Sequence, residues 1–120
     1  MPIVLDHTIV PAHDQEESAA FFARIFELSP PTANGHFTAV RVNADLTLDF
    51  DTDTGFGVHH YAFKIGDADF EAIFARLKNE GVPYGSLPSA PENGRINTGG
   101  GGRRLYFKDP SGHVLEITTR

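Results

Sequence analysis

Two histidines and two carboxylates recur at matching places in the sequence, and together they could hold a metal ion. The segment "DHTIV" lines up with "HHYAF", so that His7 matches His60. The segment "TLDFD" lines up with "VLEIT", so that Asp49 matches Glu116. Two neutral imidazoles with one or two carboxylates suit Mn²⁺, Fe²⁺, Co²⁺, Ni²⁺ or Zn²⁺ and leave positions open for water or substrate. The repetition therefore favours a metal site.

The adjacent histidines of "GVHHYAFKI" cannot both serve that site, because neighbouring residues of a strand point to opposite faces. His59 groups with Tyr61 and Phe63, a bulky set suited to the helix side of a sheet. His60 groups with Ala62 and Lys64 on the other face. We therefore expect His60 to be the ligand and His59 to have no part in the site.

Ordinary readings exist for each of these residues. A single histidine or carboxylate in a strand is more often a hydrogen-bonded or solvated residue than a ligand, and only the repetition outweighs this. His13, His36 and His113 lie outside the repeated pattern, and we expect all three at the surface. Asp49 is one methylene shorter than glutamate, so it could sit back from the metal, bind through water or act as a base.

The chain follows one structural plan twice, each copy being a strand, a helix and further strands. Alternating β-branched and apolar residues predict the strands, and apolar residues at i, i+3 and i+4 predict the helices. In the first copy, residues 1–53, we expect strands at 3–10, 36–42 and 46–51. Asp14 is the expected N-cap of a helix between the first two strands.

The second copy, residues 57–120, follows a short joint at residues 54–56. Strands are expected at 58–65, 103–108 and 113–119, with a helix over 67–81 that ends at its glycine. The stretch 83–102 contains three prolines and four consecutive glycines, which predicts a loop without helix or strand. Its residues 94–102 could act as a lid that orders when a ligand binds.

Composition excludes several classes of protein. The 120-residue chain has a net charge of −6, which argues against binding to nucleic acid or an anionic membrane surface. The absence of cysteine excludes disulfides, thiolate catalysis and cysteine-ligated zinc. The N-terminus lacks the features of a signal peptide, and no apolar run approaches the roughly 20 residues of a membrane span. A soluble cytoplasmic domain is expected.

The duplicated plan and four segments resemble the vicinal oxygen chelate superfamily. The segments are "LDHTIV", "HHYAFKI", "FEAIFARLKNEGV" and "LYFKDPSGHVLEI". This superfamily includes glyoxalase I, fosfomycin-resistance transferases, extradiol dioxygenases and bleomycin-resistance proteins. The resemblance implies an α+β fold in which two βαβββ modules form a cupped mixed sheet around one divalent metal ion. The implied ligands are His7, His60 and Glu116, with Asp49 at the fourth equivalent position.

The resemblance also implies a homodimer. In single-chain members of this length the joint is commonly too short for both modules of one chain to close one cup. We therefore expect two chains to share each site, with His7 and Asp49 of one facing His60 and Glu116 of the other.

The implied activity is that of a metal-dependent enzyme on a small substrate bound through two adjacent oxygens. A lyase, a transferase and a dioxygenase all remain open, and a protein that sequesters a drug without catalysis is the alternative. The fosfomycin-resistance group is locally similar, but it has polar serines where this chain has "GGGGRR", and threonine at the position of Ile9.

Several further residues are candidates for contacts with that substrate. Arg104 shares a face with Tyr106, and its guanidinium could grip a carboxylate, phosphate or phosphonate. Arg103 and Lys64 are further candidate anion contacts, and Thr47 shares the face of Asp49. Tyr106 and Asp49 are the candidate acid–base residues.

Overall fold

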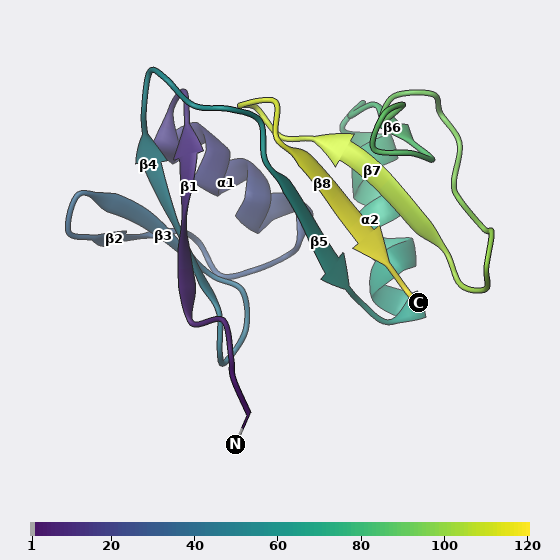
Figure 1. Cartoon of the computed structure of the whole chain (residues 1–120), viewed down its shortest axis with the longest axis horizontal. Helices are drawn as coiled ribbons and strands as arrows, with labels where there is room; N and C mark the ends of the chain where they lie inside the picture. The colour runs from purple at the N-terminus through teal and green to yellow at the C-terminus, as the bar shows by residue number, and fades with distance from the viewer. Residues whose placement is uncertain (1) are drawn as a thin grey trace. The chain divides into compact units, whose positions relative to one another are not determined.

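The computed structural model describes residues 2–120, which fall into two compact units, Met1–Gly57 and Val58–Arg120. Each unit contains one helix and one four-stranded sheet, in the order strand, helix and three strands (Figure 1). The predicted α+β class with two βαβββ modules is confirmed. Among residues 2–120, no helix combines the length and the apolar character needed to cross a membrane.

The first unit holds a mixed sheet with the strand order β1-β4-β3-β2. Strand β1 runs parallel to β4, whereas β3 is antiparallel to both β4 and β2. Its elements are β1 (His7–Ala12), α1 (Gln15–Ile25), β2 (Thr32–Asn34), β3 (Phe37–Arg41) and β4 (Thr47–Thr52).

Local chemistry sets both ends of α1. The Asp14 side chain accepts hydrogen bonds from the backbone N–H groups of Glu16 and Glu17, which confirms the predicted N-cap. Beyond the last turn, Glu27 adopts a left-handed backbone conformation with φ 54°. The N–H of Leu28 then reaches back to the carbonyl of Ala23 at 2.8 Å, which satisfies a helix-end carbonyl.

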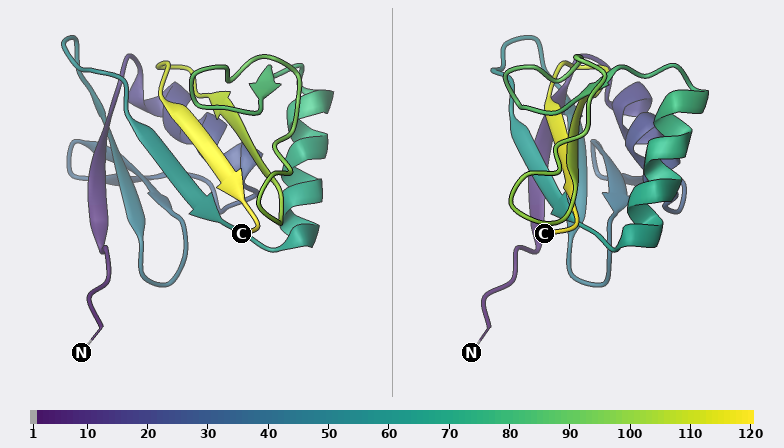
Figure 2. Two further views of the ribbon diagram at one scale, coloured as in Figure 1. Left: turned by 45° about the vertical axis from the view of Figure 1, so that its right-hand side comes forward. Right: turned by 90° about the vertical axis from the view of Figure 1, so that its right-hand side faces the viewer.

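The helix packs its apolar stripe on one face of this sheet (Figure 2). Phe22 and Ile25 of α1 are buried, and so are Leu48 and Phe50 of β4. The rings of Phe22 and Phe50 lie 6.2 Å apart. Because Leu48 and Phe50 face the helix, strand alternation puts Thr47 and Asp49 on the opposite face.

The second unit repeats this plan with the strand order β5-β8-β7-β6. Strand β5 is parallel to β8, and β7 is antiparallel to both β8 and β6. Its core includes Phe70, Leu77 and Phe107, all with no exposed surface. Its elements are β5 (His60–Lys64), α2 (Asp67–Asn79), β6 (Tyr84–Gly85), β7 (Arg104–Lys108) and β8 (Val114–Thr118).

Some element predictions were wrong in detail. The first strand begins at His7 rather than at residue 3, at the point where its partner β4 also begins. Strands β2 and β6 were not predicted, since three and two residues are too few to show an alternating pattern. β6 falls within the stretch 83–102, which was expected to contain no strand.

Hydrogen bonds hold the stretch 83–102 in place at several points. The backbones of Asn97 and Arg104 exchange two hydrogen bonds of 2.9 Å. The Asn97 side chain donates to the carbonyl of Ser86 at 3.2 Å. Gly100, Gly101 and Gly102 have φ values of 76°, 82° and 73°, which residues with a side chain rarely adopt. A lid at residues 94–102 stays a prediction.

Candidate metal and substrate site

In the second unit, an imidazole and a carboxylate meet directly. His60 Nε2 lies 3.0 Å from Glu116 Oε1. Glu116 is only 9% exposed, whereas the side chain of His60 is 43% exposed. The pair therefore combines a carboxylate held within the sheet with an imidazole that solvent or a ligand can reach.

In the first unit, His7 and Asp49 lie on neighbouring strands. Asp49 is 5% exposed, and its Oδ1 accepts a hydrogen bond of 3.2 Å from Asn34 Nδ2. His7 is exposed, and its Nδ1 lies 2.8 Å from Asp6 Oδ2. The hydrogen bond that His7 donates to Asp6, more than the charge of Asp49, raises the pKa of His7 above its ordinary value. Because Asp6 engages Nδ1, Nε2 of His7 is the nitrogen available to a metal.

The strand registers make these two pairs equivalent. In the first unit, His7 is level with Thr47, and Asp49 is level with the residue two positions beyond His7. In the second unit, His60 is level with Val114, and Glu116 is level with the residue two positions beyond His60. Each sheet thus presents one imidazole and one carboxylate at the same two points.

These donors fit a divalent metal ion by type, but each pair alone is incomplete. Within residues 2–120, no three His, Asp or Glu side chains come together in a way that could hold a metal. Catalytic metal sites commonly use three protein ligands with one position left open. Each pair, with one imidazole and one carboxylate, has fewer donors than such a set.

Tyr106 lies beside the pair of the second unit. It is level with Glu116 on the neighbouring strand, and its ring centroid is 5.8 Å from that of His60. Burial, and then the charge of Glu116, raise the pKa of Tyr106 above its ordinary value, although the Arg104 guanidinium opposes this. The phenol therefore keeps its proton at neutral pH and is available as a donor.

Arg104 lies on the same face, two residues before Tyr106. Its Nε is buried and has no hydrogen-bond partner within residues 2–120. Lys64, at the end of β5, is exposed and lies on this face as well. Thr47 lies on the face of Asp49 in the first unit, where its hydroxyl accepts a hydrogen bond of 3.0 Å from Arg41.

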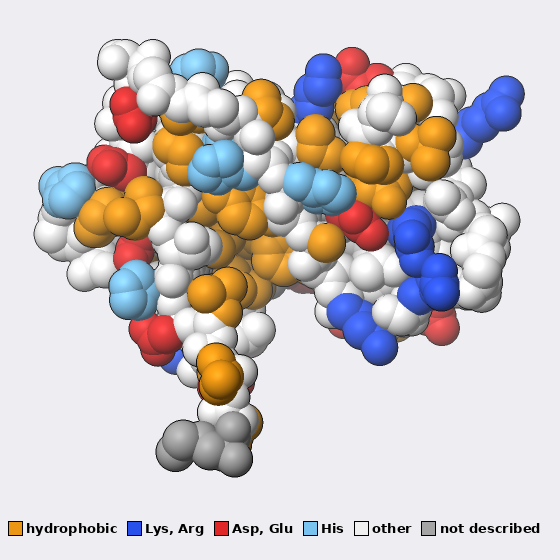
Figure 3. Space-filling model, in the orientation of Figure 1, with side chains coloured by type: hydrophobic (Ala, Val, Ile, Leu, Met, Phe, Trp, Pro, Cys, Tyr) orange, Lys and Arg blue, Asp and Glu red, His pale blue; other side chains and the backbone are white. Residues whose placement is uncertain are grey.

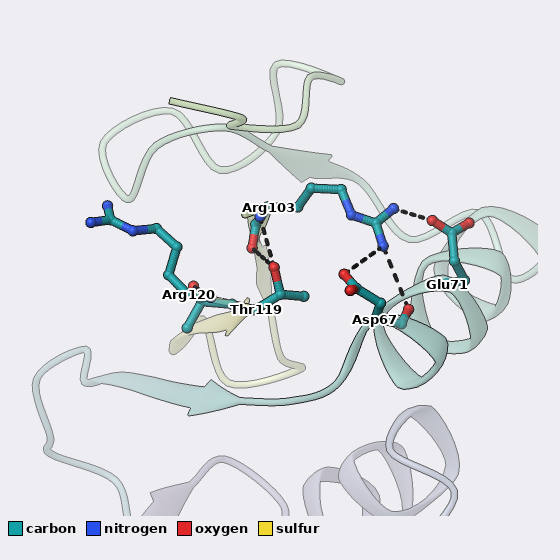
Figure 4. Close-up of polar contacts among 6 residues, drawn as sticks. Asp67, Glu71, Arg103, Thr119 and Arg120 are labelled. Carbon is teal, nitrogen blue, oxygen red and sulfur yellow. Dashed lines mark hydrogen bonds and ion pairs between the residues drawn. The ribbon is translucent and has the colours of Figure 1, made fainter. Parts of the chain in front are cut away.

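The structure places Arg103 apart from these residues. Its guanidinium turns to α2, where it pairs with Glu71 and lies 3.3 Å from Asp67 (Figure 4). It also sits 4.4 Å above the centroid of the Phe70 ring. The hydrogen bond with Glu71 raises the pKa of Arg103 above its ordinary value. Arg103 thus joins β7 to the helix and is not brought together with Glu116.

His113 was expected at the surface, and that prediction was wrong. It is 0% exposed, and its Nδ1 accepts a hydrogen bond of 2.8 Å from the backbone N–H of His59. The turn that begins at Asp109 explains this burial, because the Asp109 carboxylate accepts the N–H of His113 at 2.9 Å and so curls the chain inward. His113 therefore fixes the backbone immediately before His60.

The side chain of His59 lies away from the pair formed by His60 and Glu116. Its Nδ1 is 2.6 Å from the hydroxyl of Tyr61. Three residues around the candidate ligands have roles that the sequence analysis did not assign: Asp6, Asn34 and His113, the last of which was placed at the surface. Asp6 and Asn34 offered no signal, since polar residues beside a strand or in a turn are common. The "DPSGH" turn was the only cue for His113.

Comparisons with known proteins agree with this architecture. The Glyoxalase/Bleomycin resistance protein/Dioxygenase superfamily model matches residues 4–117. The metallothiol transferase FosB of Shouchella clausii is 23% identical over 96% of this chain and 79% of its own length. The fosfomycin resistance protein FosX of Mesorhizobium japonicum is 38% identical over 51% of this chain and 39% of its own length.

Two solved structures are much more similar. Oxidase ChaP-H1 has a TM-score of 0.93 and 43% identity, over 99% of this chain and 97% of that one. Oxidase ChaP-H2 has a TM-score of 0.92 and 41% identity, over 100% of this chain and 95% of that one. The match of the superfamily model over residues 4–117 confirms the resemblance seen in the motifs. The chain belongs to the Glyoxalase/Bleomycin resistance protein/Dioxygenase superfamily.

Proposed function

We propose that this protein is a divalent-metal-dependent oxidase of a small molecule held through two adjacent oxygens. The observation that carries the proposal is the 3.0 Å contact between His60 and Glu116, with His7 at the equivalent point of the first unit. Two imidazoles and one carboxylate are the ligand set of many non-haem iron oxygenases. The identity of 43% and 41% to two proteins named as oxidases favours oxidation among the superfamily's reactions.

His7, His60 and Glu116 would hold the metal ion. When bound, such an ion supplies a Lewis acid and, if it is iron or manganese, a redox centre. Asp6 orients the imidazole of His7 for this role by holding its Nδ1, and His60 Nε2 lies close enough to Glu116 Oε1 for both to bind one ion. A carboxylate that fixes the ring of a ligating histidine commonly strengthens metal binding.

Two other residues would handle protons. Tyr106, beside Glu116, keeps its phenolic proton because burial raises its pKa, so it can donate a hydrogen bond to a substrate oxygen. Asp49 is buried and accepts a hydrogen bond from Asn34, which fixes the orientation of its carboxylate. We assign Asp49 the role of a base toward the substrate.

We propose that two copies of the chain pair to complete each site. Within residues 2–120, neither unit brings three candidate ligands together, and residues 54–56 form a short joint between the units. In the proposed dimer, His7 and Asp49 of one protomer face His60 and Glu116 of its partner. This arrangement gives two equivalent sites related by the dimer axis.

The first test is metal analysis of the purified protein and of two variants. We expect His60→Ala to lower the bound metal at least 10-fold while the fold persists. His59→Ala is the matched control, because its ring contacts Tyr61 rather than Glu116, and it should keep its metal. Equal metal content in both variants and the wild type would rule the site out. Oxygen uptake with catechols, under Fe²⁺ and Mn²⁺, then tests the oxidase assignment.

A second candidate is a thiol transferase that inactivates fosfomycin. The similarity to FosB over 96% of the chain favours it. Incubation with fosfomycin, glutathione and Mn²⁺ separates the candidates, because a transferase consumes the thiol without oxygen. Stoichiometric binding of a small molecule that survives His60→Ala would instead indicate a sequestering protein.

A further inference from the structure

One row of side chains on the second sheet carries two cations. The registers place Lys64 of β5 level with Thr118 of β8, and Thr118 level with Arg104 of β7. Residues level with one another on neighbouring strands share a face. The row that contains Glu116 and Tyr106 lies on the same face, two residues further along the strands. The spacing between the two rows is roughly 6–7 Å, at about 3.3 Å per residue.

Arg104 has unused hydrogen-bonding capacity in this row. Its Nε is buried and lacks a hydrogen-bond partner within residues 2–120. Its backbone is fixed by the two 2.9 Å hydrogen bonds with Asn97, so the side chain starts from a defined point. A buried donor of a charged group left without a partner is costly, and a small movement of the side chain would let an anionic ligand supply the missing acceptor.

The carboxylates near this row pair with other side chains and not with Lys64 or Arg104. Asp67 and Glu71 are engaged by Arg103 at the helix (Figure 4). Glu116 belongs to the next row, where it contacts His60. The side chain of Arg120 lies against Gly100 and Gly102, in the loop that leads into β7.

The surface view agrees with this account of charge. Lys and Arg side chains gather over the end of the second sheet where β5 and β8 finish and β7 begins (Figure 3). The first unit has no such row at the equivalent points. There, Pro11 stands in place of Lys64, and Asp51 stands in place of Thr118. The cationic row is therefore a property of the second unit and not of the duplicated plan.

We propose that Lys64, Thr118 and Arg104 form an anion subsite that selects substrates with an acidic substituent. This proposal rests on the oxidase function proposed above. The subsite binds a carboxylate or phosphate group of the substrate, one row away from the substrate oxygens that are held beside Glu116. Arg104 provides a charge-assisted hydrogen bond through Nε, Lys64 provides a point charge, and the Thr118 hydroxyl donates from between them.

The first experiment uses metal-free protein, so that it does not depend on the oxidase function. Inorganic phosphate is titrated into the ¹⁵N-labelled chain, and the backbone amide shifts are followed by NMR. We expect saturable shifts at residues 64, 104 and 118, and Arg104→Gln should weaken the apparent affinity roughly 10-fold or more. Arg24→Gln on α1 makes the same change of charge away from the row and should leave the affinity unchanged.

The second experiment uses Zn²⁺-loaded protein and two catechols of similar shape. One, 3-(3,4-dihydroxyphenyl)propionate, carries a carboxylate, and the other, 4-propylcatechol, is neutral. Calorimetry should show the acid bound roughly 10- to 100-fold more tightly. Arg104→Gln should bring that affinity ratio close to one. Lys64→Met should lower the ratio by a smaller factor, and this exposed position gives a second variant if Arg104→Gln fails to fold.

The outcomes separate the two proposals. Equal binding of both catechols, without phosphate shifts at the row, would overturn the subsite and leave the oxidase proposal standing. Phosphate shifts at the row, with neither catechol bound by the metal-loaded protein, would support the subsite and count against the oxidase proposal. Phosphate shifts that Arg104→Gln leaves unchanged would also overturn the subsite.

Discussion

Among single residues, two neighbouring histidines have different contacts because they point to opposite faces of the strand. His60 and His59 are adjacent, yet only His60 contacts Glu116. His59 contributes through its backbone, whose N–H donates to the buried His113. The same residue type thus serves as a candidate ligand, as a surface group and as a buried acceptor around the start of β5.

The buried His113 should matter for stability. His113→Ala opens a cavity and leaves the N–H of His59 without its acceptor. We expect the free energy of unfolding, measured in urea, to fall by about 2–4 kcal/mol. His36→Ala is the matched control, since its side chain is 71% exposed, and it should cost about 0.5 kcal/mol or less. Similar losses in the two variants would contradict this role for His113.

Asp109 should make stability depend on pH. Burial raises the pKa of Asp109 above its ordinary 3.8, although the N–H of His113 opposes this. A carboxyl whose pKa is raised on folding stabilises the folded state below its ordinary pKa and loses that contribution as the pH rises through the raised value. The free energy of unfolding of the wild type, relative to Asp109→Asn, should therefore fall as the pH rises above 3.8. Urea unfolding across a pH series checks this, and a rising difference would refute it.

Among the elements, the two helices end in the same way with different residues. After α1, Glu27 has φ 54°, and the N–H of the next residue bonds to a carbonyl of the last turn at 2.8 Å. After α2, Gly81 has φ 69°, and Val82 makes the equivalent bond at 2.8 Å. Glycine adopts this conformation without the cost that a Cβ adds.

This equivalence predicts opposite effects for two substitutions. Glu27→Gly should raise the free energy of unfolding by about 0.5–1 kcal/mol, because it relieves the left-handed conformation. Gly81→Ala should lower it by about 1 kcal/mol for the converse reason. Thermal or urea unfolding of both variants tests the pair, and a change of the same sign in both would contradict the argument.

The sequence predicted the long elements well because periodicity needs length to be read. The alternation in "LTLDFD" correctly put Leu48 and Phe50 on the helix side and Asp49, which is also buried, on the opposite face. The registers place the repeated residues at equivalent points. β2 and β6 were missed because they are too short to show a period. The burial of His113 depends on how one turn curls, which no periodic pattern records. The duplication, not any single motif, predicted the candidate ligands.

At the scale of the whole molecule, duplication leaves each unit with half of the proposed ligand set. Two units with the same strand plan present one imidazole and one carboxylate apiece. A symmetric dimer can combine such halves without any new element, because the same pair of surfaces meets twice. Because the cationic row occurs on the second unit alone, it would orient a substrate in each proposed site, with its acidic group toward Arg104.

Shared sites predict that two defective chains can restore each other. His7→Ala and His60→Ala should each lose the metal alone, but a co-refolded equal mixture should regain roughly a quarter of the sites, because half of the dimers are mixed and each mixed dimer keeps one intact site. The control is a mixture of His60→Ala with Glu116→Ala, whose changes fall on the same unit and should restore none. Metal content per chain is the measurement. If the first mixture regains nothing, His7 and His60 of each site come from a single chain, and the proposed exchange of units between protomers is wrong.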